Sequence, residues 1–251
     1  MHRRVTATLV DISRELARAT AGIEPGAPVA YVYRPLEYAW VPHEMYLSRW
    51  GGGRKEALLL GMNPGPFGMA QTGVPFGDPT LVREFLRIEG AVTKPAREHP
   101  KRPVVGLRST RSEVSGQRLW GWARERFETP ERFFARFFVV NYCPLAFMDE
   151  GGRNVTPVDL DRETVARIEH PCDAALRSTV ELLAPRYVIG VGEYARKRAE
   201  RALAGSGVTF GTILHPSPAS PKANRGWATE AERQLEALGL ELPESPGNRR
   251  G

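Results

Sequence analysis

Two stiff loops hold the residues with the clearest chemical potential. The first loop, residues 61–68, reads GMNPGPFG, and the second, residues 215–221, reads HPSPASP. Glycine lets backbone amides approach a ligand closely, and proline fixes the shape of the chain. Asn63 in the first loop can orient a water molecule but cannot take up its proton as a carboxylate would. His215 in the second can donate a hydrogen bond to negative charge that develops on a leaving group.

Each of these features also has a plainer structural explanation. The glycines suit an ordinary tight turn from a strand to a helix, and a lone histidine at the end of a strand is more often structural than catalytic. Phe76 is either a core aromatic or a platform on which a flat ligand stacks. The first loop lacks the Lys-Ser or Lys-Thr of a Walker loop and the spacing of the dinucleotide-binding fingerprint, so neither of those nucleotide sites is predicted.

The elements around the loops predict where these residues meet. Short apolar runs at 57–60, 137–140, 187–189 and 208–214 predict four strands, and longer segments with helical patterns separate them. This alternation predicts a parallel sheet covered by helices on both faces, with ligands bound at the carboxyl ends of the strands. Asn63, Asn141 and His215 each follow one of these strands, so we expect one shared site at that edge.

The helices are predicted from apolar periodicity and from capping residues. We expect a first helix with Val5 and Leu16 on its apolar face, and a helix that starts at Asp78-Pro79 and runs to about Glu89. The other predicted helices start at Thr129-Pro130, cover 162–183 with a kink or restart at Pro171, and cover 222–238. Residues 91–110 read as an exposed basic loop. The chain is predicted to form a single domain over residues 1–242, followed by a disordered tail over 243–251.

Composition limits the classes of partner. The formal net charge is +6, the isoelectric point is about 9.6 and the mean hydropathy is −0.36. A basic excess suits a polyanion such as nucleic acid, although an arginine-rich solvated surface explains it equally well. No apolar run is long enough for a membrane helix. Cys143 and Cys172 are too few for a four-cysteine metal or iron–sulfur site, so we expect an intracellular, reducing location and no metal.

The sequence as a whole resembles the single-strand-selective monofunctional uracil-DNA glycosylases. Residues 61–77, GMNPGPFGMAQTGVPFG, resemble the first active-site motif of that family, and HPSP at 215–218 with the residues up to Trp227 resembles the second. Shorter segments between them are also similar to the family: RSEVSG at 111–116, NYCPL at 141–145 and GRNVTP at 152–157. The resemblance extends from about Tyr31 to Trp227.

The resemblance implies a fold, a reaction and residue roles. The implied fold is a three-layer α/β/α sandwich around a four-stranded parallel sheet, and the implied reaction removes uracil and 5-modified uracils such as 5-hydroxymethyluracil from DNA without a cofactor. The catalytic residues would be Asn63, which holds the attacking water, and His215, which hydrogen-bonds the departing base. Asn141 would read the edge of the base and Phe76 would stack on it. The other substrate-binding residues would be Met62, Gly65 and Pro66.

The second loop would contact DNA as a wedge. Ser217 could contact a phosphate, Pro218 to Pro221 could enter the base stack, and Lys222 and Arg225 would add positive charge. The tip, Ala219-Ser220, departs from the basic tip of animal members of the family, which leaves the balance between single- and double-stranded DNA open. Because the first motif offers no lysine nucleophile, no strand cleavage is expected.

Three alternatives remain at this stage. The first is a catalytically inactive protein of the same fold that binds damaged DNA, the second is a mismatch-type glycosylase, and the third is a phosphate-binding protein that acts on free nucleotides. We expect the protein to act as a monomer on single- and double-stranded DNA, away from membranes.

Overall fold

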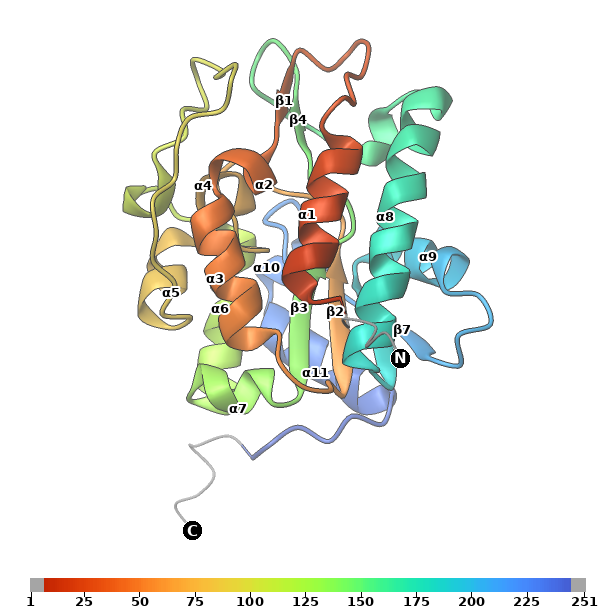
Figure 1. The fold of residues 1–251 in the computed structure, drawn as a ribbon. Coiled ribbons are helices and arrows are strands. Elements are labelled where there is room, and N and C mark those ends of the chain that lie inside the picture. The colour runs from red at the N-terminus through yellow and green to blue at the C-terminus, as the bar shows by residue number, and fades with distance from the viewer. Residues whose placement is uncertain (1–6, 245–251) are drawn as a thin grey trace, which may run out of the picture.

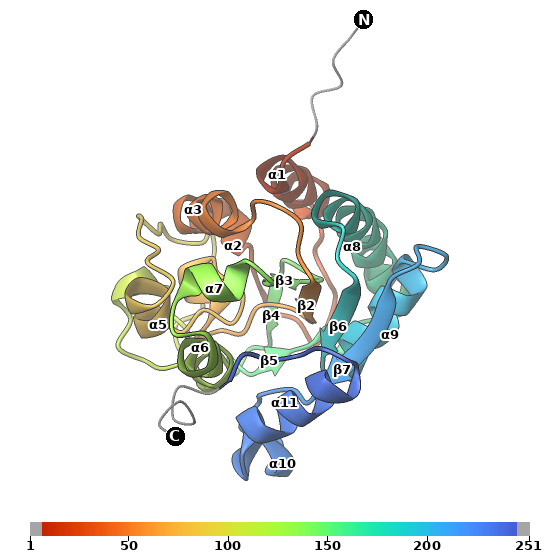
Figure 2. The same cartoon turned by 90° about the horizontal axis from the view of Figure 1, so that it is seen from below.

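A four-stranded parallel sheet forms the centre of the protein, and helices cover both of its faces (Figures 1 and 2). The computed structural model describes residues 7–244. The strand order is β3-β2-β6-β7, and the strands are β2 (Ala57–Gly61), β3 (Phe137–Asn141), β6 (Tyr187–Val191) and β7 (Thr209–Ile213). The predicted three-layer α/β/α sandwich with four parallel strands is therefore confirmed, and each strand agrees with its predicted position to within two residues.

The side chains of β3 show how the layers are held together. Phe138 stacks on Tyr46 of α3 (Trp40–Trp50), with ring centroids 5.2 Å apart. Phe137 points the other way and meets Trp122 of α6 (Val114–Phe127) edge to face. Alternate residues of a strand face opposite sides, so an apolar run of this kind needs a helical layer on each side. On the α3 side lie α1 (Leu9–Thr20), α8 (Arg162–Leu183) and α9 (Glu193–Ala202), and on the α6 side lies α11 (Trp227–Ala237) (Figure 2).

A second, antiparallel sheet was not predicted. It consists of β1 (Tyr31–Tyr33), β4 (Ala146–Met148) and β5 (Asn154–Val155), in the order β1-β4-β5. Its strands have two or three residues each, too few to show an alternating pattern in the sequence. β4 follows β3 in the chain after only a few residues, so the small sheet lies next to the carboxyl edge of the large one.

The helix starts agree with their capping residues. Thr8 and Asp11 form a capping box at the start of α1, Asp78 caps α5 (Pro79–Glu84) and Thr129 caps α7 (Pro130–Phe134). α5 ends earlier than the predicted Glu89, because the chain turns away at Phe85 and Arg87 takes a positive φ of 56°. Two short helices complete this part of the chain, α2 (Pro35–Tyr38) and α4 (Met69–Thr72).

Of two helix predictions in the second half of the chain, one is narrowed and one was wrong. α8 is one continuous helix with Pro171 inside it, so of the predicted kink or restart the restart does not occur. The helix expected over 222–238 is instead divided into α10 (Pro221–Asn224) and α11. Gly226 separates them with φ at +136°, a conformation that no helix contains.

Residues at both ends of the chain fall outside the described part. Val5, which was expected on the first helix, and residues 245–251 of the expected tail both lie outside the described residues. Pro243, the first residue of that tail, is described, and its carbonyl accepts a hydrogen bond from Arg126 at 3.1 Å. Between residues 7 and 244, no helix combines the length and the apolar character that crossing a membrane would require.

Candidate active site

The carboxyl ends of the four strands lie in one row. Gly61 pairs with Asn141, Leu60 pairs with Gly190, and Val191 pairs with Ile213. Parallel strands in this register deliver the residues that follow them to one edge of the sheet. The structure therefore brings the loop after β2, the end of β3 and the loop after β7 together, as the sequence predicted.

Asn63 is fixed two residues beyond the end of β2. The backbone pairing of β2 and β3 continues past the strands, because Tyr142 and Cys143 donate their N–H groups to the carbonyls of Gly61 and Met62, both at 2.9 Å. The half-buried side chain of Asn63 then donates from Nδ2 to the carbonyl of Leu145 at 3.2 Å. With the amide nitrogen held in this way, Oδ1 of Asn63 is the atom left to accept a hydrogen bond, for example from a water molecule.

Asn141 and Phe76 meet above the α-carbon of Gly61. A Cβ atom on Gly61 would lie 2.2 Å from Oδ1 of Asn141 and 2.8 Å from the ring of Phe76. Only glycine fits at this position, and its absent side chain lets the amide and the ring approach each other. Phe76 holds its place with φ at +52°, a strained conformation for a residue with a Cβ.

The amide of Asn141 is only partly satisfied. Its Nδ2 donates to the sulfur of Met69 at 3.3 Å, while Oδ1 is buried and has no hydrogen-bond partner in the described part of the chain. A buried acceptor without a partner costs about 1–3 kcal/mol. An acceptor that is left unpaired beside an aromatic ring is suited to a flat ligand that presents an N–H group.

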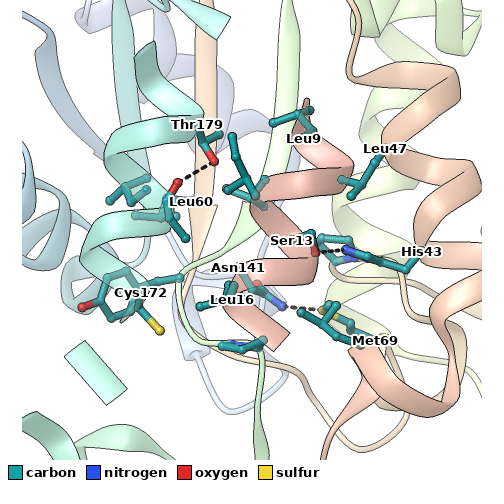
Figure 3. Close-up of a pocket in the computed structure, with 18 of the residues that line it drawn as sticks. Leu9, Ser13, Leu16, His43, Leu47, Leu60, Met69, Asn141, Cys172 and Thr179 are labelled. Carbon is teal, nitrogen blue, oxygen red and sulfur yellow. Dashed lines mark hydrogen bonds between the residues drawn. The ribbon is translucent and has the colours of Figure 1, made fainter. Parts of the chain in front are cut away.

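A small cavity lies behind Asn141, between α1, α3, α8 and the sheet (Figure 3). Its volume is about 70 Å³, and most of its wall is apolar, including Leu9, Leu60 and Met69. The two polar side chains labelled on the α1 and α3 side, Ser13 and His43, hydrogen-bond to each other at 2.7 Å. Ser13 and His43 thus satisfy each other within a largely apolar wall.

His43 of α3 also holds the first loop in place. Its Nδ1 donates to the carbonyl of Gly73 at 2.7 Å, and its Nε2 accepts from the hydroxyl of Ser13. Burial lowers the pKa of His43 to about 4, so the imidazole is neutral near pH 7. The sequence did not single out His43, since a buried histidine in a helix has no distinctive pattern.

His215 presents a defined nitrogen to the site. Its Nδ1 accepts a hydrogen bond from the backbone N–H of Ser217 at 3.1 Å. A nitrogen that accepts carries no proton, so the neutral ring has its proton on Nε2. Burial lowers the pKa of His215, which favours this neutral form at pH 7. The ring centroids of His215 and Phe76 are 6.1 Å apart, so the histidine stands beside the stacking ring.

The start of α6 holds both loops, a role that the sequence did not reveal. A Cβ on Gly116 would lie 2.0 Å from the carbonyl oxygen of Phe76, so the helix touches the backbone of the first loop directly. Two residues further, Arg118 donates to the carbonyls of Pro216 and Ser217, at 3.0 and 3.2 Å, and to Oδ1 of Asn224 at 2.8 Å. One helix therefore sets the distance between the two loops.

Gly65 and Pro66 lie on the rim of the first loop, half-buried like Met62. Gln71 donates to the carbonyls of Pro66 and Pro103 and accepts from the N–H groups of Val105 and Gly106. Its amide thus ties the rim to the loop that precedes α6. Gln71 is buried, and nothing in the sequence distinguishes it from an ordinary polar residue of the motif.

The residues predicted to contact DNA fall into two groups. Ser217 and Ser220 use their hydroxyl oxygens to accept backbone N–H groups, from Ala219 and Ala223, so both shape the loop. The tip residues Pro218 and Ala219 are exposed, as are the side chains of Lys222 and Arg225 on and after α10. The structure therefore presents an uncharged tip with two cations beside it.

The described residues offer no metal site. Between residues 7 and 244, no three histidine, cysteine, aspartate or glutamate side chains are grouped closely enough to hold a metal ion. Cys143 and Cys172 are both buried and free. The predicted site residues Asn63, Asn141, His215 and Phe76 bring two amides, an imidazole and an aromatic ring to this edge.

Comparison with known proteins agrees with this geometry. The family model of the uracil DNA glycosylase superfamily matches residues 50–236. The chain is 53% identical over 215 residues to the single-strand selective monofunctional uracil-DNA glycosylase of Rattus norvegicus and 51% identical over 214 residues to that of Bos taurus. These alignments cover 85% and 84% of this chain and 77% and 79% of the relatives.

A solved structure with low sequence identity shares the fold. The crystal structure of SMUG2 from Pedobacter heparinus superimposes with a TM-score of 0.61 at 16% identity, covering 91% of this chain and 97% of that one. The match of the family model to most of the chain, and of the relatives to more than three quarters of their own length, settles the family. The chain belongs to the uracil-DNA glycosylase superfamily and, within it, to the single-strand-selective monofunctional uracil-DNA glycosylases.

Proposed function

We propose that this protein is a monofunctional uracil-DNA glycosylase that extrudes uracil and 5-modified uracils from DNA and hydrolyses the glycosidic bond, leaving an abasic site for base excision repair. The observation that carries the proposal is the buried, unpartnered Oδ1 of Asn141 beside the ring of Phe76 and the imidazole of His215. Asn63 and His215 are the proposed catalytic residues.

Recognition of the base would use the unsatisfied amide. Uracil carries a hydrogen on N3, and Oδ1 of Asn141 is an acceptor without a partner. Cytosine presents an acceptor at the same ring position, so the pair would repel and the buried oxygen would remain unsatisfied. Sites of this kind reject an analogue that lacks the required hydrogen by large factors. Phe76 would stack on the ring, which no duplex allows unless the base is first turned out of the helix.

Departure of the base would come before capture of water. As the bond between the sugar and N1 breaks, negative charge moves onto the base and positive charge onto the sugar. Nε2–H of His215 would donate to the 2-oxo oxygen of the departing base. One such donor typically contributes about a hundred- to a thousandfold in rate. Oδ1 of Asn63 would hold the water that then attacks the sugar cation. The proton that this water loses would pass to the departed uracil anion or to solvent, not to Asn63.

The product would be an intact abasic strand. A lyase step needs an amine that forms a covalent bond to the sugar. The motif loop at 61–77 has no lysine, and Lys222 lies on the exposed α10, where a phosphate contact is the expected role.

Two further features concern the range of substrates. Gly65 at the rim of the first loop has no side chain, and we propose that this leaves room for a substituent at the 5-position of the base. The uncharged tip, Pro218-Ala219-Ser220, would enter the base stack, with Lys222 and Arg225 on neighbouring phosphates. We propose action on both single- and double-stranded DNA, with weaker opening of duplexes because the tip carries no charge.

We propose a single glycosylase domain over residues 1–242 that acts as a monomer, with every residue assigned to the site contributed by this one chain. The two buried free cysteines suit the intracellular location proposed for it.

The test is incubation with oligonucleotides that carry one uracil, single-stranded and paired, followed by alkali to cut at abasic sites. We expect cleavage only after alkali, and free uracil in the supernatant. Absence of alkali-sensitive cleavage, with retained binding to uracil-containing or abasic DNA, would identify the inactive binding protein instead. Cleavage before alkali would contradict the monofunctional assignment, and release of uracil from a free nucleoside would favour a small-molecule substrate.

A further inference from the structure

The loop before α6 gathers positive charge beside the site. In residues 101–111, here called the 101–111 loop, the side chains of Lys101, Arg108 and Arg111 are exposed and that of Arg102 is half-buried. Within the described part of the chain, no carboxylate lies within ion-pair distance of any of these four. The neighbouring Lys94, by contrast, pairs with Glu98. None of the four thus forms an ion pair, although Arg111 lies close enough to Glu113 to oppose the rise that burial causes in the pKa of that carboxyl.

This loop is attached to the rim of the site. Gln71 joins the backbone of 103–106 to Pro66, as described above, and Asp78 accepts hydrogen bonds from the hydroxyl of Ser112 and the N–H of Glu113 at 3.2 and 3.0 Å. The hydrogen bonds fix the position of the loop relative to Asn63, so its charges have a defined place beside the catalytic edge.

Two of the cations lie over the ring of Phe67. The guanidinium of Arg111 stands 3.6 Å from the centroid of the Phe67 ring, and that of Arg102 stands 5.2 Å from it. A guanidinium above an aromatic ring is held by the cation–π attraction while the N–H groups at its edge stay available. The Nε of Arg102 is buried and has no partner, so the group is not fully satisfied by the protein itself.

A planar, positively charged group that is pre-oriented and lacks a carboxylate partner is suited to a phosphate oxygen. We propose that Arg102 and Arg111, stacked on Phe67, bind phosphates of the DNA strand that flanks the extruded nucleotide. This rests on the proposed function, since the strand is that of the substrate. The surface lies on the 101–111 loop beside Phe67 of the first loop, separate from the wedge at 215–225. It supplies the anchoring charge that the tip of the wedge lacks.

The test compares the wild type with the Arg102→Ala/Arg111→Ala double variant on a long single-stranded oligonucleotide with one central uracil. Each phosphate contact to a single strand contributes a slope of about −0.7 to the logarithm of affinity against the logarithm of salt concentration. Loss of two contacts makes the slope less negative by about 1.4. The factor by which affinity drops between 50 and 200 mM salt is then about sevenfold smaller for the double variant than for the wild type. The KM of the double variant should rise at low salt, whereas its single-turnover rate constant with saturating enzyme stays near that of the wild type.

Arg97→Ala is the matched control, because Arg97 belongs to the same basic region and also stacks on an aromatic ring, that of Tyr31 at 4.4 Å, away from the rim. It should leave the slope and KM unchanged. Arg111→Lys keeps the charge and should restore part of the slope relative to Arg111→Ala. Thermal unfolding of each variant separates loss of the contact from loss of the fold.

The outcomes distinguish the two proposals. If the wild type releases no uracil, the proposed function fails whatever the salt slope is. If the wild type is active and the double variant, folded, shows the wild-type slope and KM, the phosphate surface on the 101–111 loop is disproved. A fall in kcat with an unchanged slope would likewise overturn it, because the two arginines would then shape the rim without contacting DNA.

Discussion

The loops after β2 and β7 contribute to the same site but are held in different ways. The first, residues 61–77, is largely buried, and side chains from several helices hold its backbone, including His43, Gln71 and the start of α6. The second, residues 215–225, is held mainly at its base, where Arg118 and Trp227 bind backbone carbonyls, and its tip is exposed.

This difference suits the task that we propose for each loop. A group that reads a base or places water must be held to within a fraction of an ångström, because binding and rate depend steeply on geometry. A loop that enters a base stack must remain accessible to DNA. His215 belongs to the second loop but is held as firmly as the first, because it stands at the base of the second loop and lies beside Phe76 of the first.

The largest effect on activity is expected when the contact between α6 and the backbone of the first loop is disrupted. Gly116→Ala would place a Cβ 2.0 Å from the carbonyl oxygen of Phe76 and 2.8 Å from the N of Asp78, both backbone atoms that cannot move aside. We expect uracil release to fall by about a hundredfold or more, since a displacement of about 1 Å costs that much. Gly121→Ala on the same helix meets nothing within 4 Å, and should keep full activity with unchanged or slightly higher stability. Equal activity of the two variants would contradict the role of α6.

Variants of Phe76 distinguish the contribution of the ring to substrate binding from the backbone strain of its positive φ. Removing the ring should raise KM by about ten- to a hundredfold, as expected for a lost stacking contact of about 1–3 kcal/mol. Because φ is +52°, Phe76→Gly should be more stable than Phe76→Ala by about 1 kcal/mol. Urea unfolding of the two variants measures this difference. An alanine variant as stable as the glycine variant would show that the positive φ is relaxed when the ring is absent.

Arg118 tests the hold on the second loop. Arg118→Ala removes hydrogen bonds to Pro216, Ser217 and Asn224. This change should destabilise the folded conformation of the second loop by about 1–3 kcal/mol. We expect KM for a paired substrate to rise about tenfold, with a smaller change for a single strand, which needs no opening. Arg118→Lys cannot reach three acceptors and should restore little. Equal losses on both substrates would show that Arg118 supports His215 more than the tip.

The smallest effect concerns pH. Burial lowers the pKa of His215 below its ordinary value of 6.5, so the neutral form persists when the pH falls to 6.5 and is lost only below the lowered pKa. Protonation would place a hydrogen on Nδ1 and break the bond from the N–H of Ser217. The single-turnover rate constant should therefore keep more than half of its pH 8 value at pH 6.5 and fall further as the pH drops through the lowered pKa. A value already halved at pH 6.5 would indicate an ordinary histidine pKa.

The sequence predicted the large sheet because its strands are uniformly apolar. β2 and β3 are buried over most of their length, and their ends place Asn63 and Asn141 at one edge without any need for long-range information. The small sheet of β1, β4 and β5 could not be predicted in this way, since strands this short depend on their partners. The single helix expected over 222–238 failed at Gly226, because the bond from Trp227 to the carbonyl of Leu214 turns the chain there.

The site shows the same division. Residue types at strand ends identified Asn63, Asn141 and His215, and the structure brings them together. The supports were missed, because Arg118, Gln71 and His43 act across 98, 34 and 30 residues of sequence. The partners that they hold in the two loops are mostly backbone carbonyls and N–H groups, which leave no pattern in the sequence. The tautomer of His215 likewise depends on a hydrogen bond that only the fold creates.

The central claim is that His215 stabilises the departing base while Asn63 places water, and a change of leaving group tests it most directly. Single-turnover rates would be compared for uracil and for 5-fluorouracil, which leaves more readily as an anion, in the wild type, His215→Ala and Asn63→Ala. We predict that the defect of His215→Ala, about a hundred- to a thousandfold with uracil, shrinks with 5-fluorouracil, whereas that of Asn63→Ala changes little. A His215→Ala defect of the same size for both bases would contradict the account.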